Sequence, residues 1–288
     1  MTETGREAAD HAAGYGELER LRAELRDVRA RLRVRPMISQ VQGILQERYA
    51  LPDGESAFAL MQRASQRYNI RLRTLADTVL AVPRPDPGAD LWFPRRSRSP
   101  QPALRFPEAR RTGAENRGAV LSAVLSQALA VAGTDMGNVQ VVDRAMGGLR
   151  IEKHTGLSAD FVDFFGYVGD DGTACAEAAR NVTQVTVRDV QTDPVFTEPA
   201  REAILAAGSR ACHSTPLTTD SGLCLGMVSA HFERPIEGLT ETQLKALDVM
   251  GAEAGRWLAW HDRTVVLDAL EHLHALGRVH RGRRIQRS

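Results

Sequence analysis

The stretch ACHSTPLTTDSGLCLGMVSAHFER, residues 211–234, contains two runs of strand-forming residues around Asp220, Ser221 and Gly222. Turn-forming residues between two such runs are typical of a β-hairpin. The two strands of a hairpin are antiparallel, because a short turn cannot carry the chain back to begin a parallel neighbour. The stretch therefore predicts an antiparallel sheet in the C-terminal half of the chain.

Further strands and helices are expected on both sides of this hairpin. MGNVQVVDR (136–144) and GLRIEKHTG (148–156) form a second hairpin candidate with Gly147 and Gly148 at the turn, and TQVTVRDV (183–190) alternates as a strand. Apolar periodicity predicts helices over residues 117–133, 158–168, 174–181, 198–208 and 240–276. Strands joined by tight turns, with helices attached, predict an α+β domain over residues 117–262.

The N-terminal part begins with residues 1–16, which are small and polar and are expected to be disordered. Over residues 17–35, leucine or valine recurs at spacings of three and four, which is the a/d seam of a coiled coil. The seam residues are Leu18, Leu21, Leu25, Val28 and Leu32. So short a coiled coil is expected to assist dimerisation rather than cause it, and packing on its own chain in a monomer is the alternative.

A compact unit of three short helices is predicted over residues 36–82, because Pro36 ends the preceding helix. Its three apolar faces consist of Ile38, Val41, Ile44 and Leu45, then Ala57, Phe58, Leu60, Met61 and Ala64, and finally Ile70, Leu72, Leu75, Ala76, Val79 and Leu80. The third helix, IRLRTLADTVLA (70–81), leaves Arg71 and Arg73 on the outer side. Asn69 before it suits a left-handed position.

Residues 83–116 contain seven prolines, many arginines and almost no periodicity. This composition predicts a flexible linker with polyproline II character between two domains. Trp92 and Phe93 are unusual in such a linker. They are either a docked aromatic anchor or an ordinary contact to one neighbouring domain.

Charge is distributed unevenly, although the formal net charge is only +1. Residues 17–35 carry seven arginines against four acids, residues 83–117 carry eight against four, and residues 118–263 carry 11 basic against 19 acidic residues. Residues 263–288 are expected to form a helical extension with a basic tail, because five arginines and no acids follow residue 277. Basic flanks suit a polyanionic partner, although arginine-rich linkers are also ordinary in arginine-rich proteomes.

Three cysteines, Cys175, Cys212 and Cys224, are too few and too far apart for a disulfide framework or a CxxC-type zinc site. The first residues lack the basic-then-apolar pattern of a signal peptide, and no apolar stretch is long enough to span a bilayer. We therefore expect a cytoplasmic protein with no metal site and no membrane partner.

A dispersed pattern runs through residues 38–80 and consists of Ile38, Gln40, Gly43, Ile44, Ala57, Phe58, Leu60, Arg63, Ser65, Asn69, Leu72 and Ala76. With this pattern the stretch resembles the ANTAR domain, the three-helix RNA-binding module of bacterial antitermination regulators. Two positions depart from the family: Gln42 stands in place of a usual lysine and Gln62 in place of a common arginine. Both departures remove a positive charge that would help to neutralise phosphate.

The resemblance implies that two modules, paired as a homodimer, hold tandem stem-loops in nascent RNA and prevent a terminator hairpin from forming. The RNA-binding residues that it implies are Arg63, Ser65, Arg67, Asn69, Arg71 and Arg73. Arginine and polar side chains suit this task, since sequence-specific RNA recognition favours splayed loop bases and phosphates. For each residue, an ordinary solvated helix surface is the alternative. The resemblance also places Ala57, Leu60, Leu72 and Ala76 in the core.

Residues 118–260 carry the motifs GTDMGNVQ (133–140), FVDFF (161–165), VRDVQTDPVF (187–196), STPL (214–217) and GLCLGMVSAHF (222–232). With these motifs the stretch resembles a GAF domain, a small-molecule sensor or dimer module whose antiparallel sheet cups a ligand under its loops. Ala176 replaces the glycine that usually follows the Ala174-Cys175 pair. The family fold implies Phe161, Phe164, Phe165 and Cys175 as ligand-pocket residues, while the ligand and any cofactor stay unnamed.

Candidate chemistry in this domain is limited to thiols and imidazoles, namely Cys175, Cys212, Cys224, His154, His213 and His231. Cys212 and His213 are neighbours in a strand and point to opposite faces, so they cannot enter one pocket. A Cys–His hydrolase also needs an oriented base and an oxyanion site, which the sequence does not specify. We therefore predict no enzyme, and we expect Asp135 and Asn138 to hold loop backbone rather than ligand.

Taken together, the two resemblances predict a one-component regulator of transcription antitermination and signal transduction, in which a GAF sensor controls an ANTAR RNA-binding module. The alternative is a GAF sensor or scaffold whose N-terminal helical bundle dimerises without binding RNA. Gln42 and Gln62 favour this alternative, whereas Arg63, Arg71 and Arg73 oppose it.

Overall fold

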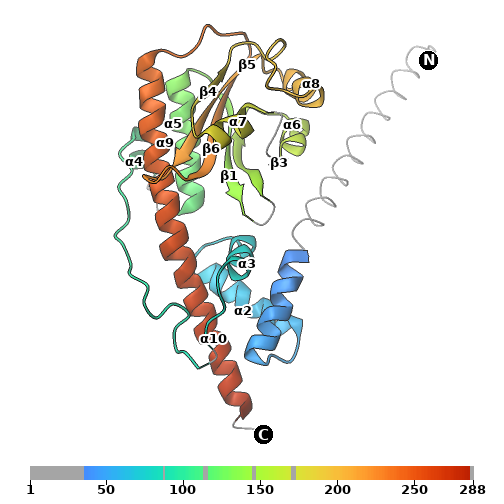
Figure 1. Ribbon diagram of the computed structural model, residues 1–288, viewed down its shortest axis with the longest axis vertical. Helices are drawn as coiled ribbons and strands as arrows, with labels where there is room; N and C mark the ends of the chain where they lie inside the picture. The colour runs from blue at the N-terminus through green and yellow to red at the C-terminus, as the bar shows by residue number, and fades with distance from the viewer. Residues whose placement is uncertain (1–35, 87, 113–115, 145–146, 170–172, 286–288) are drawn as a thin grey trace, which may run out of the picture. The chain divides into compact units, whose positions relative to one another are not determined.

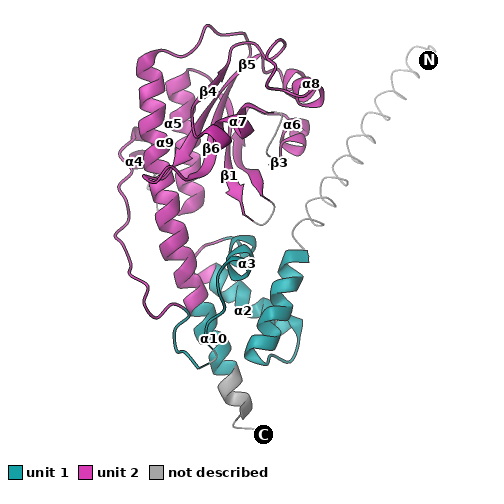
Figure 2. Ribbon diagram, in the orientation of Figure 1, with its two compact units in different colours: residues 1–65, 71–92, 272–288 teal, residues 66–70, 93–271 magenta. Residues whose placement is uncertain are grey.

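The computed structural model describes residues 36–86, 88–112, 116–144, 147–169 and 173–285. The predicted disordered start (1–16) and coiled coil (17–35) therefore lie outside the described residues. The chain divides into two compact units, shown in Figure 2. Unit 1 comprises residues 1–65, 71–92 and 272–288, and unit 2 comprises residues 66–70 and 93–271.

Three short helices follow one another where the sequence predicts them: residues 36–49, α2 (Gly54–Arg67) and α3 (Leu72–Ala81). The apolar faces meet, because Val41, Leu45, Leu60, Met61, Leu75 and Ala76 are all fully buried. Leu72, expected in the core, is only half-buried because it is the first residue of α3. Asn69 has a φ of 49°, so the predicted left-handed position between α2 and α3 is confirmed.

The C-terminal helix α10 (Leu267–Ile285) contributes its residues from His272 onward to unit 1. The buried Tyr49 hydroxyl lies 2.8 Å from Nδ1 of His274, a residue 225 positions away in the sequence. Gly277 faces the same tyrosine, since a Cβ atom on it would lie 2.5 Å from the ring. The expected helical extension is therefore also a structural part of the N-terminal unit.

Unit 2 contains a six-stranded antiparallel sheet with the strand order β3-β2-β1-β6-β5-β4. Its strands are β1 (Met136–Asp143), β2 (Gly148–Thr155), β3 (Tyr167–Val168), β4 (Val185–Val187), β5 (Ala211–Thr218) and β6 (Cys224–Phe232). Both predicted hairpins, β1–β2 and β5–β6, are present and antiparallel. The predicted α+β class is thereby confirmed.

Helices cover both faces of this sheet (Figure 1). One face packs against α4 (Pro107–Thr112), α5 (Arg117–Ala132) and α9 (Glu241–His261), with Trp257 fully buried in the core between them. The other face packs against α6 (Ala159–Phe164), α7 (Ala174–Asn181) and α8 (Glu198–Ala206). The central strands β1, β5 and β6 supply both cores because successive side chains point to opposite faces, as Met227 and Val228 do in β6.

Two local features differ from the sequence prediction. Residues Tyr167 and Val168 were expected to continue the helix that is α6, but they pair with β2 as the short strand β3. The long closing helix is interrupted by a π-helical turn, η1 (Asp262–Val266), between α9 and α10. Helical hydrogen bonding nevertheless continues from Glu241 to Ile285, so the interruption is a change of pitch rather than a break.

The composition of the proline-rich segment after Trp92 predicts a flexible linker. In the structure, however, this segment makes specific contacts. The Phe93 backbone N–H donates to the Glu271 carboxylate at 2.8 Å, and the Trp260 indole N–H donates to the Ser99 carbonyl at 2.9 Å. Asp268 pairs with both Arg96 and Arg98. These partners come from α9 and α10, which sequence periodicity in the segment itself could not reveal.

Candidate functional site

The six residues implied for RNA binding lie in one continuous stretch around the connection between α2 and α3. Arg63, Arg67, Asn69 and Arg71 are exposed, whereas Ser65 and Arg73 are half-buried. The left-handed Asn69 reverses the chain, and Arg71 follows in an extended conformation as the N-cap residue of α3. Exposed arginine residues thus stand both before and after the turn.

Gln42, one of the two departures from the family pattern, has a structural role in this protein. Its side-chain amide donates to the Gly54 carbonyl at 2.9 Å and so ties the first helix to the start of α2. Gln62, the second departure, is exposed on α2. The amide at position 42 therefore supports the bundle in place of a cation at its surface.

A second candidate site is a small cavity between the sheet of unit 2 and the helices on its second face. Its lining includes three of the four predicted pocket residues, Phe161, Phe165 and Cys175. The cavity volume is about 20 Å³, which is room for roughly one water molecule. In this conformation the site is closed to any larger ligand.

Phe164, the fourth predicted pocket residue, does not line this cavity and is 47% exposed. The reason is the helical period of α6, where residues four apart share a face. Phe161 and Phe165 are four apart and both point inward, with ring centroids 4.5 Å apart. Phe164 therefore lies outside this cavity, unlike the other three predicted residues.

Polar side chains from the central strands form a hydrogen-bonded network along the cavity floor. The Cys175 thiol lies 3.1 Å from the Ser229 hydroxyl, which in turn lies 2.9 Å from the Ser214 hydroxyl. On the other side, the Asn138 amide lies 3.3 Å from Nε2 of His231, and Nδ1 of that ring lies 3.0 Å from the Ser209 hydroxyl. Burial lowers the pKa of His231 to about 4, so the ring is neutral at pH 7.

The polar floor of the cavity was missed by the sequence analysis, which assigned Asn138 to loop backbone. In the structure Asn138 and Gln140 line the cavity from β1, and Ser229 and His231 line it from β6. The missed signal is a period of two, since each pair is separated by one residue and therefore shares a sheet face. Alternating polar residues in otherwise apolar strands could have identified this floor.

Cys212 and His213 lie on opposite faces of β5, as predicted. Cys212 lines the cavity, whereas His213 is bonded through Nε2 to the Gln184 side chain at 2.7 Å and through Nδ1 to the Thr186 hydroxyl at 2.7 Å. Burial lowers the pKa of His213 to about 4, although Asp248 acts in the opposite direction. The two residues therefore cannot act as a nucleophile and base pair.

Burial raises the pKa of the thiols of Cys175, Cys212 and Cys224. Because the thiolate is the reactive form, we expect all three to react with a thiol reagent at pH 7 at least about tenfold more slowly than free cysteine. Labelling the native chain with 5,5′-dithiobis(2-nitrobenzoate) measures this rate, and urea-unfolded chain is the control for full accessibility. A thiol that reacts faster than free cysteine would contradict the prediction and favour a catalytic role.

Within the described ranges, no group of three or more histidine, cysteine or carboxylate side chains is arranged to hold a metal ion. No helix in the same ranges is long and apolar enough to cross a membrane.

Several solved structures are similar to part of this chain at low sequence identity. They include a domain of a two-component sensor histidine kinase protein from Sinorhizobium meliloti, at 19% identity over 50% of this chain and 92% of that chain, with a TM-score of 0.43. Free methionine-R-sulfoxide reductase from Neisseria meningitidis is 19% identical over 54% and 87%, with a TM-score of 0.42. The GAF domain of an Acinetobacter phosphoenolpyruvate-protein phosphotransferase is 14% identical over 54% and 92%, with a TM-score of 0.43.

No curated protein sequence matches the chain. One protein family does, and the matching segment is residues 26–80, which include α2 and most of α3. The family is described as the ANTAR domain. The chain therefore contains an ANTAR domain at residues 26–80, which confirms that part of the sequence prediction.

Proposed function

We propose that the chain is an RNA-binding regulator of transcription antitermination, in which the ANTAR module binds stem-loops in nascent RNA and a GAF-like sensor domain controls that binding. The observation that carries the proposal is the ANTAR match over residues 26–80, together with the exposed arginines at the α2–α3 connection. Guanidinium groups suit RNA because they pair with phosphate and stack on unpaired bases.

The sensing part of the proposal is supported by unmet hydrogen-bonding capacity in the unit 2 cavity. The side-chain oxygens of Asn138 and Gln140 are buried there without a hydrogen-bond partner in the described residues. Leaving a buried acceptor unpaired costs about 1–3 kcal/mol, which a ligand with N–H or O–H donors would recover. Because the cavity is closed, such a ligand binds a more open conformation of the domain. Binding then shifts the equilibrium of the domain from the closed to the open conformation.

Dimerisation is a further part of the proposal, because the family picture requires two modules on tandem stem-loops. Two linked modules bind two linked sites with an affinity gained through effective concentration, so a change in dimer geometry would alter RNA affinity. The alternative function is a dimerising scaffold without RNA binding. The structural use of Gln42 favours that alternative, since the amide leaves no cation at this position.

The proposal is tested by measuring binding of the full chain to a library of tandem stem-loop RNAs over a salt series. Replacing both Arg71 and Arg73 by alanine is expected to weaken binding to the preferred loops at least tenfold, because charge-assisted hydrogen bonds are each worth about 1.5–3 kcal/mol. The slope of log affinity against log salt is also expected to fall by about 2, one for each lost phosphate contact.

The matched control replaces two exposed arginines of unit 2, Arg188 and Arg234, by alanine and makes the same change in net charge. This control is expected to retain loop-dependent binding. If both double variants lose affinity equally, and loop sequence has no effect, binding comes from general charge. The scaffold function would then be the better account.

A further inference from the structure

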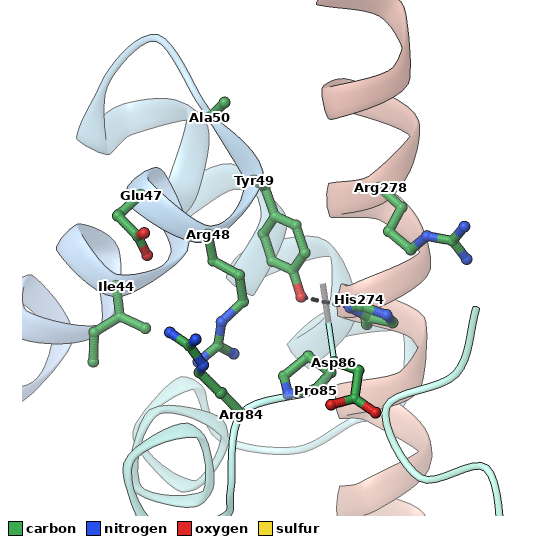
Figure 3. A pocket seen from close by; sticks show the side chains of 10 residues that line it. All are labelled: Ile44, Glu47, Arg48, Tyr49, Ala50, Arg84, Pro85, Asp86, His274 and Arg278. Carbon is green, nitrogen blue, oxygen red and sulfur yellow. Dashed lines mark hydrogen bonds between the residues drawn. The ribbon is translucent and has the colours of Figure 1, made fainter. Parts of the chain in front are cut away.

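Unit 1 contains a cavity of about 500 Å³, which lies outside the α2–α3 connection and belongs to neither candidate site described above. Three segments form it: the end of the first helix (44–50), residues 84–86, and α10 through His274 and Arg278 (Figure 3). Pockets for small molecules usually measure about 300–1,000 Å³. The cavity is therefore large enough for a ligand of ordinary metabolite size.

Hydrogen bonds hold the α10 side of the cavity in one arrangement. Nε2 of His274 lies 3.1 Å from the Ala89 carbonyl, which can only accept, so this nitrogen carries the proton. Nδ1 is hydrogen-bonded to the Tyr49 hydroxyl at 2.8 Å, as the dashed line in Figure 3 marks. Both ring nitrogens of His274 are thus occupied by hydrogen bonds within unit 1, and the ring forms a wall of the cavity rather than a ligand-binding group.

Arg48 brings to this cavity a positive charge with an unsatisfied hydrogen-bond donor. Its guanidinium lies 4.8 Å from the ring centroid of Trp92, which is buried and anchored by an indole N–H bond of 2.8 Å to the Pro83 carbonyl. Nη1 of Arg48 is buried and has no hydrogen-bond partner in the described residues. Because guanidinium does not lose its proton, this donor stays unsatisfied until an acceptor is brought to the Arg48 side chain, which lines the cavity.

Arg84 brings a second guanidinium into the same cavity from the segment after α3 (Figure 3). Glu47 and Asp86 also line the cavity, but both residues are exposed to water, and neither forms an ion pair with Arg48 or Arg84 in the described part of the chain. Arg278 is already paired with Asp90. The buried, unsatisfied group is therefore cationic, whereas the carboxylates of the cavity are solvated.

From this geometry we propose that the cavity binds a phosphorylated small molecule, with Arg48 and Arg84 holding the phosphate group. Guanidinium forks match the oxygens of a phosphate, and Ile44 and Pro85 offer apolar contact to the rest of the ligand. A free small molecule fits better than an RNA backbone because the unsatisfied Arg48 nitrogen is buried. This site is independent of RNA binding at the α2–α3 connection.

The test is calorimetric titration of the full chain with pyrophosphate at constant ionic strength. One binding site per chain is expected, and replacing Arg84 by glutamine is expected to weaken the affinity about tenfold. Arg48→Gln is expected to weaken it at least as much, and Arg48→Lys to restore only part because the fork is lost. Arg84 is exposed, so we expect the Arg84→Gln variant to fold. This variant therefore tests the proposal even if the Arg48→Gln variant does not fold.

The charge-matched control is Arg95→Gln, at an exposed position outside the cavity, which is expected to bind pyrophosphate like the unaltered chain. Absence of saturable binding, or equal weakening by Arg95→Gln and Arg84→Gln, would overturn the proposal. Displacement of pyrophosphate by a stem-loop RNA would also overturn it, since the cavity would then serve the RNA backbone. Unchanged pyrophosphate affinity in the Arg71/Arg73 double variant would support the independence of the two sites.

Discussion

Acidification from pH 6.5 to pH 4 is expected to lower the free energy of unfolding of unit 2 by about 5 kcal/mol, about 2.5 kcal/mol for each of two buried histidines. Burial lowers the pKa of both His213 and His231 from 6.5 to about 4. In the unfolded chain both rings take up a proton near pH 6.5, whereas in the folded chain they stay neutral until about pH 4. The unfolded state therefore binds more protons in this window. The contribution of the two neutral rings to the free energy of unfolding is complete above about pH 6.5 and decreases as the pH falls toward 4.

Urea unfolding of the full chain at pH 7 and pH 5 checks this prediction before most carboxylates are protonated. Between these two values each buried histidine is expected to contribute about 2 kcal/mol of the loss. His231→Gln should remove its share of the pH dependence, whereas His154→Gln, at an exposed position on β2, should leave it unchanged. Full pH dependence in a chain that lacks both His213 and His231 would show that other groups cause it.

Gly255→Ala is expected to destabilise unit 2 by about 3 kcal/mol or more, the upper part of the range for overpacking a core. A Cβ atom at Gly255 would fall on the backbone of Thr218 in β5. One turn earlier, a Cβ atom at Gly251 would lie 2.5 Å from the Pro216 carbonyl oxygen. The two glycines let α9 approach β5 closely, and a backbone cannot yield as the end of a flexible side chain can.

Thermal unfolding followed by circular dichroism measures the effect, with Gly43→Ala as the matched control. Gly43 lies in the first helix, and a Cβ atom there would meet nothing within 4 Å. Alanine at that position is expected to stabilise the helix by about 1 kcal/mol, because glycine is the poorer helix former. Equal stability of Gly255→Ala and the unaltered chain would mean that α9 does not pack on β5 as described.

The sequence by itself was sufficient for the features that depend on local periodicity. Two strand-forming runs around the turn at 220–222 predicted the β5–β6 hairpin and with it the antiparallel sheet, and apolar spacing predicted the helices of residues 36–82. The opposite orientation of Cys212 and His213 followed from the period of a strand. The RNA-binding candidates came from family resemblance, and their location at an exposed turn is compatible with it.

Only the tertiary structure decided the features that join residues distant in the chain. Tyr49 meets His274 across 225 positions, and the Arg48–Arg84 cavity exists only once α10 joins unit 1. The polar floor of the sensor cavity likewise requires β1, β5 and β6 to lie side by side. Periodicity records which face of an element is buried, but not the element against which that face packs. Charge and burial at both cavities are set by such partners, and so the chemistry of each cavity is a property of the folded chain.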